Sequence, residues 1–275
     1  MTKSSIIIPA FNEEASIGAL LTVLSTPEID SVCEIFVICN GCSDTTFAIA
    51  SSFENVSTSE SLPGKSRALN QGDRLANDLF PRLYLDADVR ISPDSVLSLL
   101  QSLDTSEVRV AGPRVEYDLD HRPFVVQRFY RAQETVPCFR QWRSEHLEGR
   151  GVYGTNHAAR RRFGEFPEIR ADDAFFDRQY VSAEKITVDS SLAKISTPTS
   201  VGQLIRNEMR AAVGNRELAL LSPESVPKSV STKPKWISSW RHPQISNLVV
   251  WLLVEVWVRI RIILRLGSKR RESWR

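Results

Sequence analysis

Three short apolar runs, each followed directly by polar residues, constrain the fold of this chain most. The runs are Ser5–Ile8, Ile35–Ile38 and Leu83–Leu85. Strands that are apolar throughout, rather than at alternate positions, are covered on both faces of a sheet. Helix-like segments separate the runs. We therefore expect an α/β fold with a doubly wound, mostly parallel, Rossmann-like sheet and helices on both faces.

The segments between the runs have the apolar spacing of helices. Helices are predicted over Glu13–Leu24, Lys65–Leu79 and Pro93–Leu103, with Ser92 as the N-cap of the last. Pro9 is expected to end the first strand, because proline cannot donate to a sheet ladder. Beyond about residue 112 the pattern is less regular.

The chain length predicts one large domain with a small appendage. The domain is expected over residues 1–220, in two halves that cover residues 1–115 and 116–220. Residues 221–244 are rich in Ser, Pro and Lys and predict a linker. Residues 245–275 form a separate tail in this scheme.

Charge is spread unevenly along the chain. The net charge is +2, but residues 233–275 hold ten Lys or Arg and two Asp or Glu, so this part carries +8 and the remainder −6. A basic tail on an acidic body indicates contact with an anionic surface such as lipid. The body has no basic stripe and no nucleic-acid motif, so nucleic acid is not expected as a partner.

The tail contains a strongly apolar predicted helix at residues 245–266. Four charged residues interrupt it and fall within about 160° of one another at 100° per residue. They are Glu255, Arg259, Arg261 and Arg265. We therefore expect a basic, amphipathic C-terminal helix that lies in a membrane surface. Packing on the body, or on a second copy of the chain in a homodimer, is the alternative.

Cysteine content and the first residues indicate the compartment. Four cysteines are too few for a disulfide framework, and Met1 to Ser5 runs directly into an apolar segment without a signal peptide. We expect a cytoplasmic protein, located on the inner face of the membrane if the tail binds lipid. Cys39 and Cys42 lack a second ligand pair, so zinc or redox use is not expected.

A polar cluster follows each apolar run. The clusters are Pro9–Glu13, Asn40–Asp44 and Asp86–Asp88. Open α/β sheets bind ligands beyond the carboxyl ends of their strands, so the three clusters should meet at one rim.

Asp86 and Asp88 alternate at a strand end, so their side chains cannot both point into a core. A hard divalent cation prefers oxygen ligands and commonly bridges carboxylate to phosphate oxygens. A solvated strand end is the alternative interpretation. The neighbouring polar clusters favour a cation site.

Two further groups allow both a functional and a structural interpretation. Asp172 and Asp173 lie at the start of a predicted helix. They either cap that helix and complement its dipole, or supply a general base that accepts a proton from a hydroxyl. Lys65 opens another helix, whose N-terminus suits an anion. Arg206 and Arg210 form either a solvated basic face or a clamp for a diphosphate.

Four segments resemble, in order and spacing, the family 2 inverting glycosyltransferases, which have the GT-A fold of the nucleotide-diphospho-sugar transferases. The segments are Ser5–Glu14, Cys39–Thr46, Gly64–Asn70 and Leu85–Asp88. The resemblance implies inverting transfer of a sugar from a nucleotide diphosphate sugar to a hydroxyl of a saccharide or a lipid-linked acceptor. It also implies a place in the synthesis of cell-surface polysaccharide or glycolipid.

The resemblance implies roles for the matching positions. Residues 1–115 would be the half that binds the nucleotide sugar, and residues 116–220 the acceptor half. The residues expected to bind the nucleotide sugar are Pro9, Phe11, Glu13, Asn40, Asp44, Lys65, Asp86, Ala87, Arg206 and Arg210. The metal ligands would be Asp88 and Asp86, with Mn²⁺ or Mg²⁺. The catalytic base would be Asp173, with Asp172 beside it. The residues close to the acceptor would be Gly154, Thr155 and Asn156.

The chain departs from the usual family pattern at two points. Cys39 replaces the usual Asp, which removes one contact to the nucleoside and leaves the base identity open. The acidic pair is Asp172-Asp173 rather than the commoner Glu-Asp.

Two other functions remain as alternatives. A nucleotidyltransferase that forms sugar nucleotides usually has a Gly-rich loop after its first strand, whereas Pro9–Glu13 contains no glycine. A non-catalytic, glycosyltransferase-like scaffold has no need for acidic site residues, yet Asp86, Asp88 and Asp173 are all present.

Overall fold

The computed structural model describes residues 3–221 and 245–272, with backbone only from residue 265 onward. The strands are β1 (Ser4–Ala10), β2 (Cys33–Asn40), β3 (Val56–Ser61), β4 (Arg82–Leu85), β5 (Arg90–Ile91), β6 (Val110–Asp118), β7 (Val152–Thr155) and β8 (Lys185–Ser196). The helices are α1 (Ile17–Leu24), α2 (Pro27–Val32), α3 (Thr46–Ser51), α4 (Lys65–Ala76), α5 (Pro93–Leu103), α6 (Phe124–Thr135), α7 (Pro137–Glu145), α8 (His157–Arg160), α9 (Asp172–Arg178), α10 (Val201–Ala219) and α11 (Ile245–Glu272). One 3₁₀ turn, η1 (Ser182–Glu184), precedes β8.

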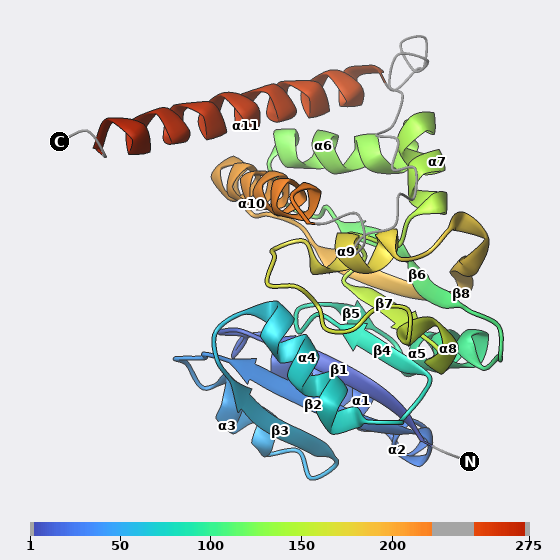
Figure 1. Ribbon diagram of the computed structural model, residues 1–275. Helices are drawn as coiled ribbons and strands as arrows, with labels where there is room; N and C mark the ends of the chain where they lie inside the picture. Colours follow the sequence, from blue (N-terminus) through green and yellow to red (C-terminus); the bar gives the residue numbers. More distant parts are fainter. Residues whose placement is uncertain (1–2, 222–244, 273–275) are drawn as a thin grey trace.

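The strands form one eight-stranded sheet in the order β3-β2-β1-β4-β7-β6-β8-β5 (Figure 1). Strands β3, β2, β1 and β4 are parallel, as are β6 and β8, whereas β7 and β5 pair antiparallel with their neighbours. The expected doubly wound α/β sheet with an appended C-terminal helix is confirmed. The antiparallel strand β7, which joins the two halves of the sheet, lies in the stretch where the sequence pattern was irregular.

Alternate residues of β1 face two separate apolar cores. Ile6 and Ile8 pack with α1, α3 and α5 on one face of the sheet. Ile7 packs with α4 and α9 on the other face. A Cβ added at Gly72 of α4 would lie 2.4 Å from Ile7 Cγ2, so this glycine lets the helix approach the strand closely. Burial on both faces explains why β1 is apolar throughout.

Helices α6, α7, α10 and α11 form a further layer beside the second half of the sheet (Figure 1). Phe129 of α6, Leu204 of α10 and Val254 of α11 share one apolar cluster. Leu248 of α11 packs with Phe139 of α7 in another. The C-terminal helix therefore rests on the body of the protein.

Several element predictions need correction. Pro9 does not end the first strand: it pairs in register with Ile38 inside β1. The first helix begins at Ile17 rather than Glu13, because residues 11–16 form a polar loop. The prediction for residues 93–103 is confirmed in full, with the Ser92 hydroxyl accepting from the Ser95 N–H. The predicted linker, residues 221–244, lies outside the described residues except for residue 221.

Candidate active site

The carboxyl ends of β1, β2 and β4 lie side by side, as the parallel register requires. Three loops leave this edge, at residues 11–16, 41–45 and 86–89, and we call them together the first rim. The N-terminus of α4 adjoins it through an ion pair of Lys65 with Asp86. The expected meeting of the three polar clusters is therefore observed.

Hydrogen bonds tie the first two loops of the rim together. Asn12, with φ of 54°, accepts from the Ser43 N–H at 2.8 Å. The Thr46 hydroxyl accepts from the Glu13 N–H at 2.7 Å and donates to Asp44 Oδ1 at 2.6 Å. Asp44 Oδ2 accepts from the Glu14 N–H at 3.2 Å. The position of Asp44 is thus set by the backbone of both loops.

Four carboxylates gather at the first rim and influence one another. Loss of solvation raises the pKa of Glu13, and the charges of Asp88, Asp86 and Asp44 raise it further. Loss of solvation and the charge of Asp86 raise the pKa of Asp88, against the opposing effect of Lys65 and Arg210. A cation at this rim would relieve the repulsion between these groups.

The donor set at the first rim suits a hard cation that also takes ligands from a bound phosphate. Asp88 is exposed, and Asp86 is partly exposed at the end of β4. Within the described residues, no group of three or more His, Cys, Asp or Glu side chains is arranged to hold a metal ion on its own. Mg²⁺ and similar ions are commonly held by one or two carboxylates together with phosphate oxygens and water. The two aspartates fit that mode of binding.

Lys65 connects the first rim to the helix α9. Its Nζ lies 2.8 Å from Asp86 Oδ1 and 3.1 Å from Asp172 Oδ2. Burial opposes the charge of Lys65, but Asp172, Asp86 and Asp173 together raise its pKa well above the ordinary value. The ammonium group therefore stays charged and joins a residue of the first half of the chain to one of the second half.

The two aspartates at the start of α9 have different surroundings. Asp172 is 3% exposed and accepts a hydrogen bond from the Tyr153 hydroxyl at 3.2 Å. Burial raises the pKa of Asp172 to about 6, although Lys65 opposes this shift. Asp173 is partly exposed, and its carboxylate accepts from the N–H groups of Gly149 and Ala174. Of the two, Asp173 is the one that is accessible to solvent.

A loop at residues 146–151, which the sequence reasoning did not include in the site, holds the two halves together. Gly149 N–H donates to Asp173 Oδ2 at 2.6 Å, and Gly151 O accepts from the Asp86 N–H at 2.8 Å. A Cβ at Gly151, which has φ of 65°, would lie 2.4 Å from Val89 Cγ2. Gly149 and Gly151 were the signal that could have identified this loop. We call it the 146–151 loop.

A buried ionic network fixes the 146–151 loop against α9. Asp177 is fully buried and accepts from His146 Nδ1 at 2.6 Å, from the Leu147 N–H at 2.7 Å and from Lys185 Nζ at 2.8 Å. Burial opposes ionisation of Asp177, but the His146 and Lys185 contacts outweigh it and lower the pKa of this carboxyl. In the same loop, burial and the charge of Asp173 raise the pKa of Glu148 to about 8.

Three residues expected near the acceptor do not reach the site. Gly154 and Thr155 are in β7, where Thr155 pairs with Arg82 at the start of β4, the end opposite to Asp86. Thr155 is fully buried, and a Cβ at Gly154 would meet Leu83 and Leu103. Asn156 is 3% exposed and caps α8 by accepting from the Ala159 N–H. The expectation for these residues is corrected: they support the sheet.

The other residues expected to bind the nucleotide sugar differ in solvent exposure. Pro9, Asn40 and Ala87 have buried side chains, and Asn40 donates to the Ala10 carbonyl at 2.9 Å. These three shape the rim through the backbone. Phe11, in contrast, is 55% exposed. Arg210 of α10 acts on Asp88 electrostatically, and Arg206, one turn earlier, is exposed.

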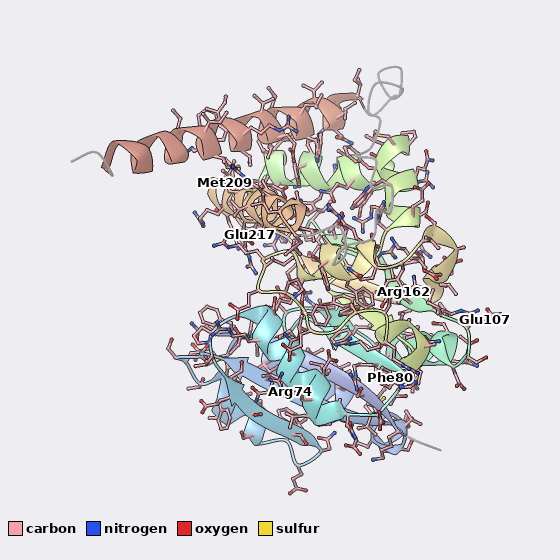
Figure 2. All side chains as sticks on the ribbon, viewed as in Figure 1. Arg74, Phe80, Glu107, Arg162, Met209 and Glu217 are labelled. Atoms are coloured by element: carbon pink, nitrogen blue, oxygen red, sulfur yellow. The ribbon has the colours of Figure 1, made fainter. Side chains whose placement is uncertain are left out.

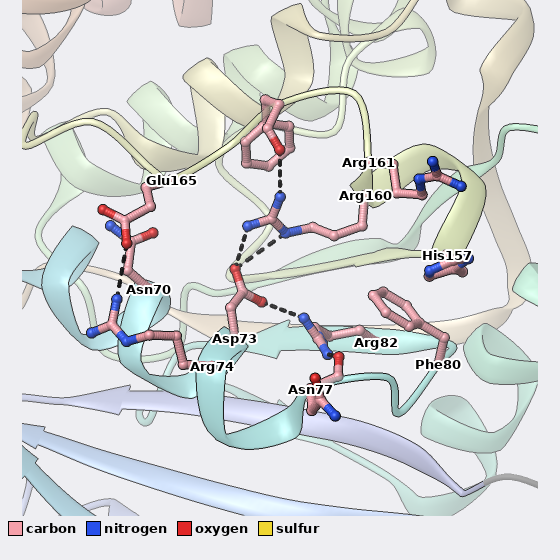
Figure 3. A pocket seen from close by; sticks show the side chains of 11 residues that line it. Asn70, Asp73, Arg74, Asn77, Phe80, Arg82, His157, Arg160, Arg161 and Glu165 are labelled. Carbon is pink, nitrogen blue, oxygen red and sulfur yellow. Dashed lines mark hydrogen bonds and ion pairs between the residues drawn. The ribbon is translucent and has the colours of Figure 1, made fainter.

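A separate hollow of roughly 290 Å³ lies near the start of β4 (Figure 3). There Arg82 and Arg160 both form ion pairs with Asp73, at 2.7 Å each, and the Tyr84 hydroxyl donates to the same carboxylate. Arg82 also donates to the Asn77 carbonyl. Backbone carbonyls accept further hydrogen bonds from both guanidinium groups, so the hollow is lined by a structural network. It is on the order of 13 Å from Asp86 along the strand.

One family model matches the sequence, and several solved structures have a similar fold. The sequence model described as glycosyl transferase family 2 matches residues 5–165. The mannosyltransferase PcManGT from Pyrobaculum calidifontis, solved in complex with GDP-Man and Mn²⁺, has a similar structure with a TM-score of 0.59 and 15% identity. That match covers 99% of this chain and 83% of the other. No curated protein matches the sequence.

Two further structures are similar at comparable identity. Glucosyl-3-phosphoglycerate synthase from Mycobacterium tuberculosis, in complex with Mn²⁺ and UDP-glucose, has a TM-score of 0.54 and 20% identity over 83% of this chain and 81% of that one. S. aureus TarS 1–349, in complex with UDP-GlcNAc, has a TM-score of 0.52 and 16% identity over 72% and 59%. At such identities the similarity concerns the fold.

Proposed function

The chain belongs to glycosyl transferase family 2, and from this membership we propose that it transfers a sugar from a nucleotide diphosphate donor to a hydroxyl group, with inversion at the anomeric carbon. The fold is that of the GT-A glycosyltransferases. The observation that carries the proposal is that Lys65 joins Asp86 of the first rim to Asp172 at the start of α9. The groups proposed to bind the donor and the aspartates proposed for proton transfer therefore lie at the same site.

The first rim is the proposed donor site. Asp44, which two loops hold in place, would contact the nucleoside base, and Phe11 offers an exposed ring on the loop at residues 11–16. Similar structures hold UDP-glucose, UDP-GlcNAc or GDP-Man. All are nucleotide diphosphate sugars, so a donor of this class is proposed, with either base.

Asp88 is the proposed ligand of Mn²⁺ or Mg²⁺, with Asp86 beside it, since two similar structures hold Mn²⁺. Such an ion offsets the charge that develops on a departing diphosphate. Lys65, Arg210 and Arg206 would add positive charge on the side of α4 and α10, because arginine suits phosphate oxygens. Asp86 would then contact Lys65 and also face the bound diphosphate.

Asp173 is the proposed base, and the reaction is a single displacement. The acceptor oxygen forms a bond to the anomeric carbon while the bond from that carbon to the diphosphate oxygen breaks. The hydroxyl proton passes to Asp173, whose carboxylate the Gly149 and Ala174 N–H groups orient. General-base assistance of this kind contributes roughly 10²–10⁴-fold in rate. A saccharide or lipid-linked hydroxyl is the proposed acceptor, consistent with synthesis of a surface polysaccharide or glycolipid.

The test is a donor panel of UDP-glucose, UDP-GlcNAc and GDP-mannose, each with Mn²⁺. Binding is measured as the rise in unfolding temperature, and turnover as the release of nucleoside diphosphate. We expect one donor to bind and to be hydrolysed slowly, EDTA to abolish turnover, and Mn²⁺ or Mg²⁺ to restore it. Full turnover in EDTA would remove the metal from the mechanism. Pyrophosphate formation from a nucleoside triphosphate and a sugar phosphate would instead identify a nucleotidyltransferase, and failure to bind any donor would favour a scaffold.

A further inference from the structure

Helix α11 is apolar on two opposite faces. One face packs on the body through Leu248, Val254 and Val258, which are buried. Met209 of α10 lies on the side facing α11 in the same apolar cluster (Figure 2). The opposite face is exposed and carries seven large apolar side chains. They are Val249, Leu253, Val256, Trp257, Ile260, Ile263 and Leu264, each at least 41% exposed. We call them the outer stripe.

This arrangement corrects the expected amphipathic helix with one charged face. The charged residues were expected to form that face, and Trp251, Val258 and Ile262, which share it, instead contact the body. The body covers that side, so the charges lie toward the edges of the outer stripe. Its seven residues span about 120° of the helix surface at 100° per residue.

The edges of the outer stripe are cationic on both sides. At 100° per residue, Arg259 lies beyond one edge and Arg261 beyond the other. Both are exposed, and the Arg261 guanidinium lies 5.4 Å from the centre of the Trp257 ring. Glu255, the acidic residue of α11 whose side chain is described, lies 4.0 Å from Arg259 and also near Glu208 of α10. An apolar stripe with basic edges and an aromatic ring is typical of a helix that lies in a lipid interface.

We propose that the outer stripe docks α11, with its axis along the surface, onto an anionic lipid bilayer. The stripe is about 22 Å long from Val249 to Leu264, at 1.5 Å per residue. Because its other side is fixed on α6 and α10, only this face is available to a membrane (Figure 1). Within the described part of the chain, no helix has the length and apolar character needed to cross a bilayer.

The charge at the edges of the outer stripe favours a bilayer, rather than a second copy of the chain, as its binding partner. A two-fold pairing of outer stripes would bring together the Arg259 and Arg261 edges of both copies, against which the described part of α11 offers one acidic side chain, Glu255 beside Arg259. Residues 233–275 together carry a net charge of +8. Anionic headgroups supply the complementary charge, at a gain of about fivefold in affinity for each basic residue near the surface.

The test is co-sedimentation of the full chain, without donor, with vesicles of phosphatidylcholine alone or mixed equally with phosphatidylglycerol. We expect strong binding only to the mixed vesicles. L253S/I263S should weaken it by about tenfold or more, because two apolar side chains are lost from the contact. L75S/L192S, which replaces two exposed leucines elsewhere, should bind like the wild type. R259Q/R261Q should bind mixed vesicles about 30-fold more weakly, at about 1 kcal/mol for each arginine.

Orientation is tested with brominated lipid, which quenches nearby tryptophan. W257F should lose more of the quenching than W251F, which alters the face against the body; the four other tryptophans are the same in both variants. Wild-type binding by L253S/I263S, or greater loss of quenching in W251F, would overturn the proposal. A stable dimer that L253S/I263S dissociates, without vesicle binding by the wild type, would assign the stripe to a second copy. Because no donor is present, these outcomes do not depend on the proposed transferase activity.

Discussion

The first rim and the 146–151 loop with α9 form the two sides of one site, but different forces hold them in place. The first rim rests on strand ends whose positions follow from parallel pairing, and short hydrogen bonds such as Thr46 to Asp44 complete it. The second side rests on the buried network around Asp177. Strand pairing and hydrogen bonds between loops therefore position the first side, whereas buried ionic contacts position the second.

The largest expected effect on stability comes from breaking the second side. Asp177→Asn leaves Lys185, whose side chain is 3% exposed, without its carboxylate. Removing one partner of a buried pair lowers the free energy of unfolding by about 3–5 kcal/mol. Urea denaturation measures this loss. D177N/K185M should recover part of it, and the exposed Asp189→Asn should have little effect; a loss in D177N as small as in D189N would contradict the role of the network.

The contact between the two sides should depend on pH. The pKa of Asp172 is raised to about 6, so this carboxylate is lost as the pH falls through about 6 rather than near its ordinary value of 3.8. Protonation removes its ion pair with Lys65. We expect donor turnover, as kcat/KM, to fall by up to about tenfold per pH unit below that point.

The variant Asp172→Asn isolates this effect. It lacks the ionisable group, so its turnover should already be low near neutral pH and should change less between about pH 7 and pH 5 than that of the wild type. Asp189→Asn, which is remote from Lys65, should keep the wild-type profile. An acid limb in D172N as steep as in the wild type would show that another group controls it.

The smallest expected effect concerns the first rim. Thr46 is fully buried, and Thr46→Val removes its hydrogen bonds with the Glu13 N–H and Asp44. One unpaired N–H lowers the free energy of unfolding by about 1–2 kcal/mol. Urea denaturation should show this loss in T46V, whereas T46S keeps the hydroxyl and should remain close to the wild type. If T46V lowered the free energy of unfolding as much as D177N, the proposed difference between the two sides would be wrong.

The same contrast explains which features could be predicted from the sequence. The apolar runs that become β1, β2 and β4 each lead directly into a polar cluster, so the location of Asp44, Asp86 and Asp88 at one edge followed from the strand pattern. Strand β3 (Val56–Ser61) has few apolar residues because it lies at the edge of the sheet, and the prediction missed it. Edge strands need less burial, so their sequences carry a weaker signal.

On the second side the decisive contacts join residues far apart in the chain. The pairing of β7 with β4 turns Thr155 toward the end of the sheet opposite to Asp86, which no local pattern indicates. Gly149 and Gly151 allow the turn that brings the 146–151 loop to Asp173 and Asp86, but glycines alone do not identify their partners. Likewise, the charges on α11 indicated one polar face, although the body covers that side of the helix.

The most direct test of the proposed division of labour compares Asp88→Asn with Asp173→Asn at the same Mn²⁺ concentration. Donor binding is measured by titration calorimetry and sugar transfer or donor hydrolysis by release of nucleoside diphosphate. We expect D88N to lose Mn²⁺-dependent donor binding, and D173N to bind donor like the wild type while turnover falls by roughly 10²–10⁴-fold. Wild-type turnover in D173N, or unchanged Mn²⁺-dependent binding in D88N, would contradict the account.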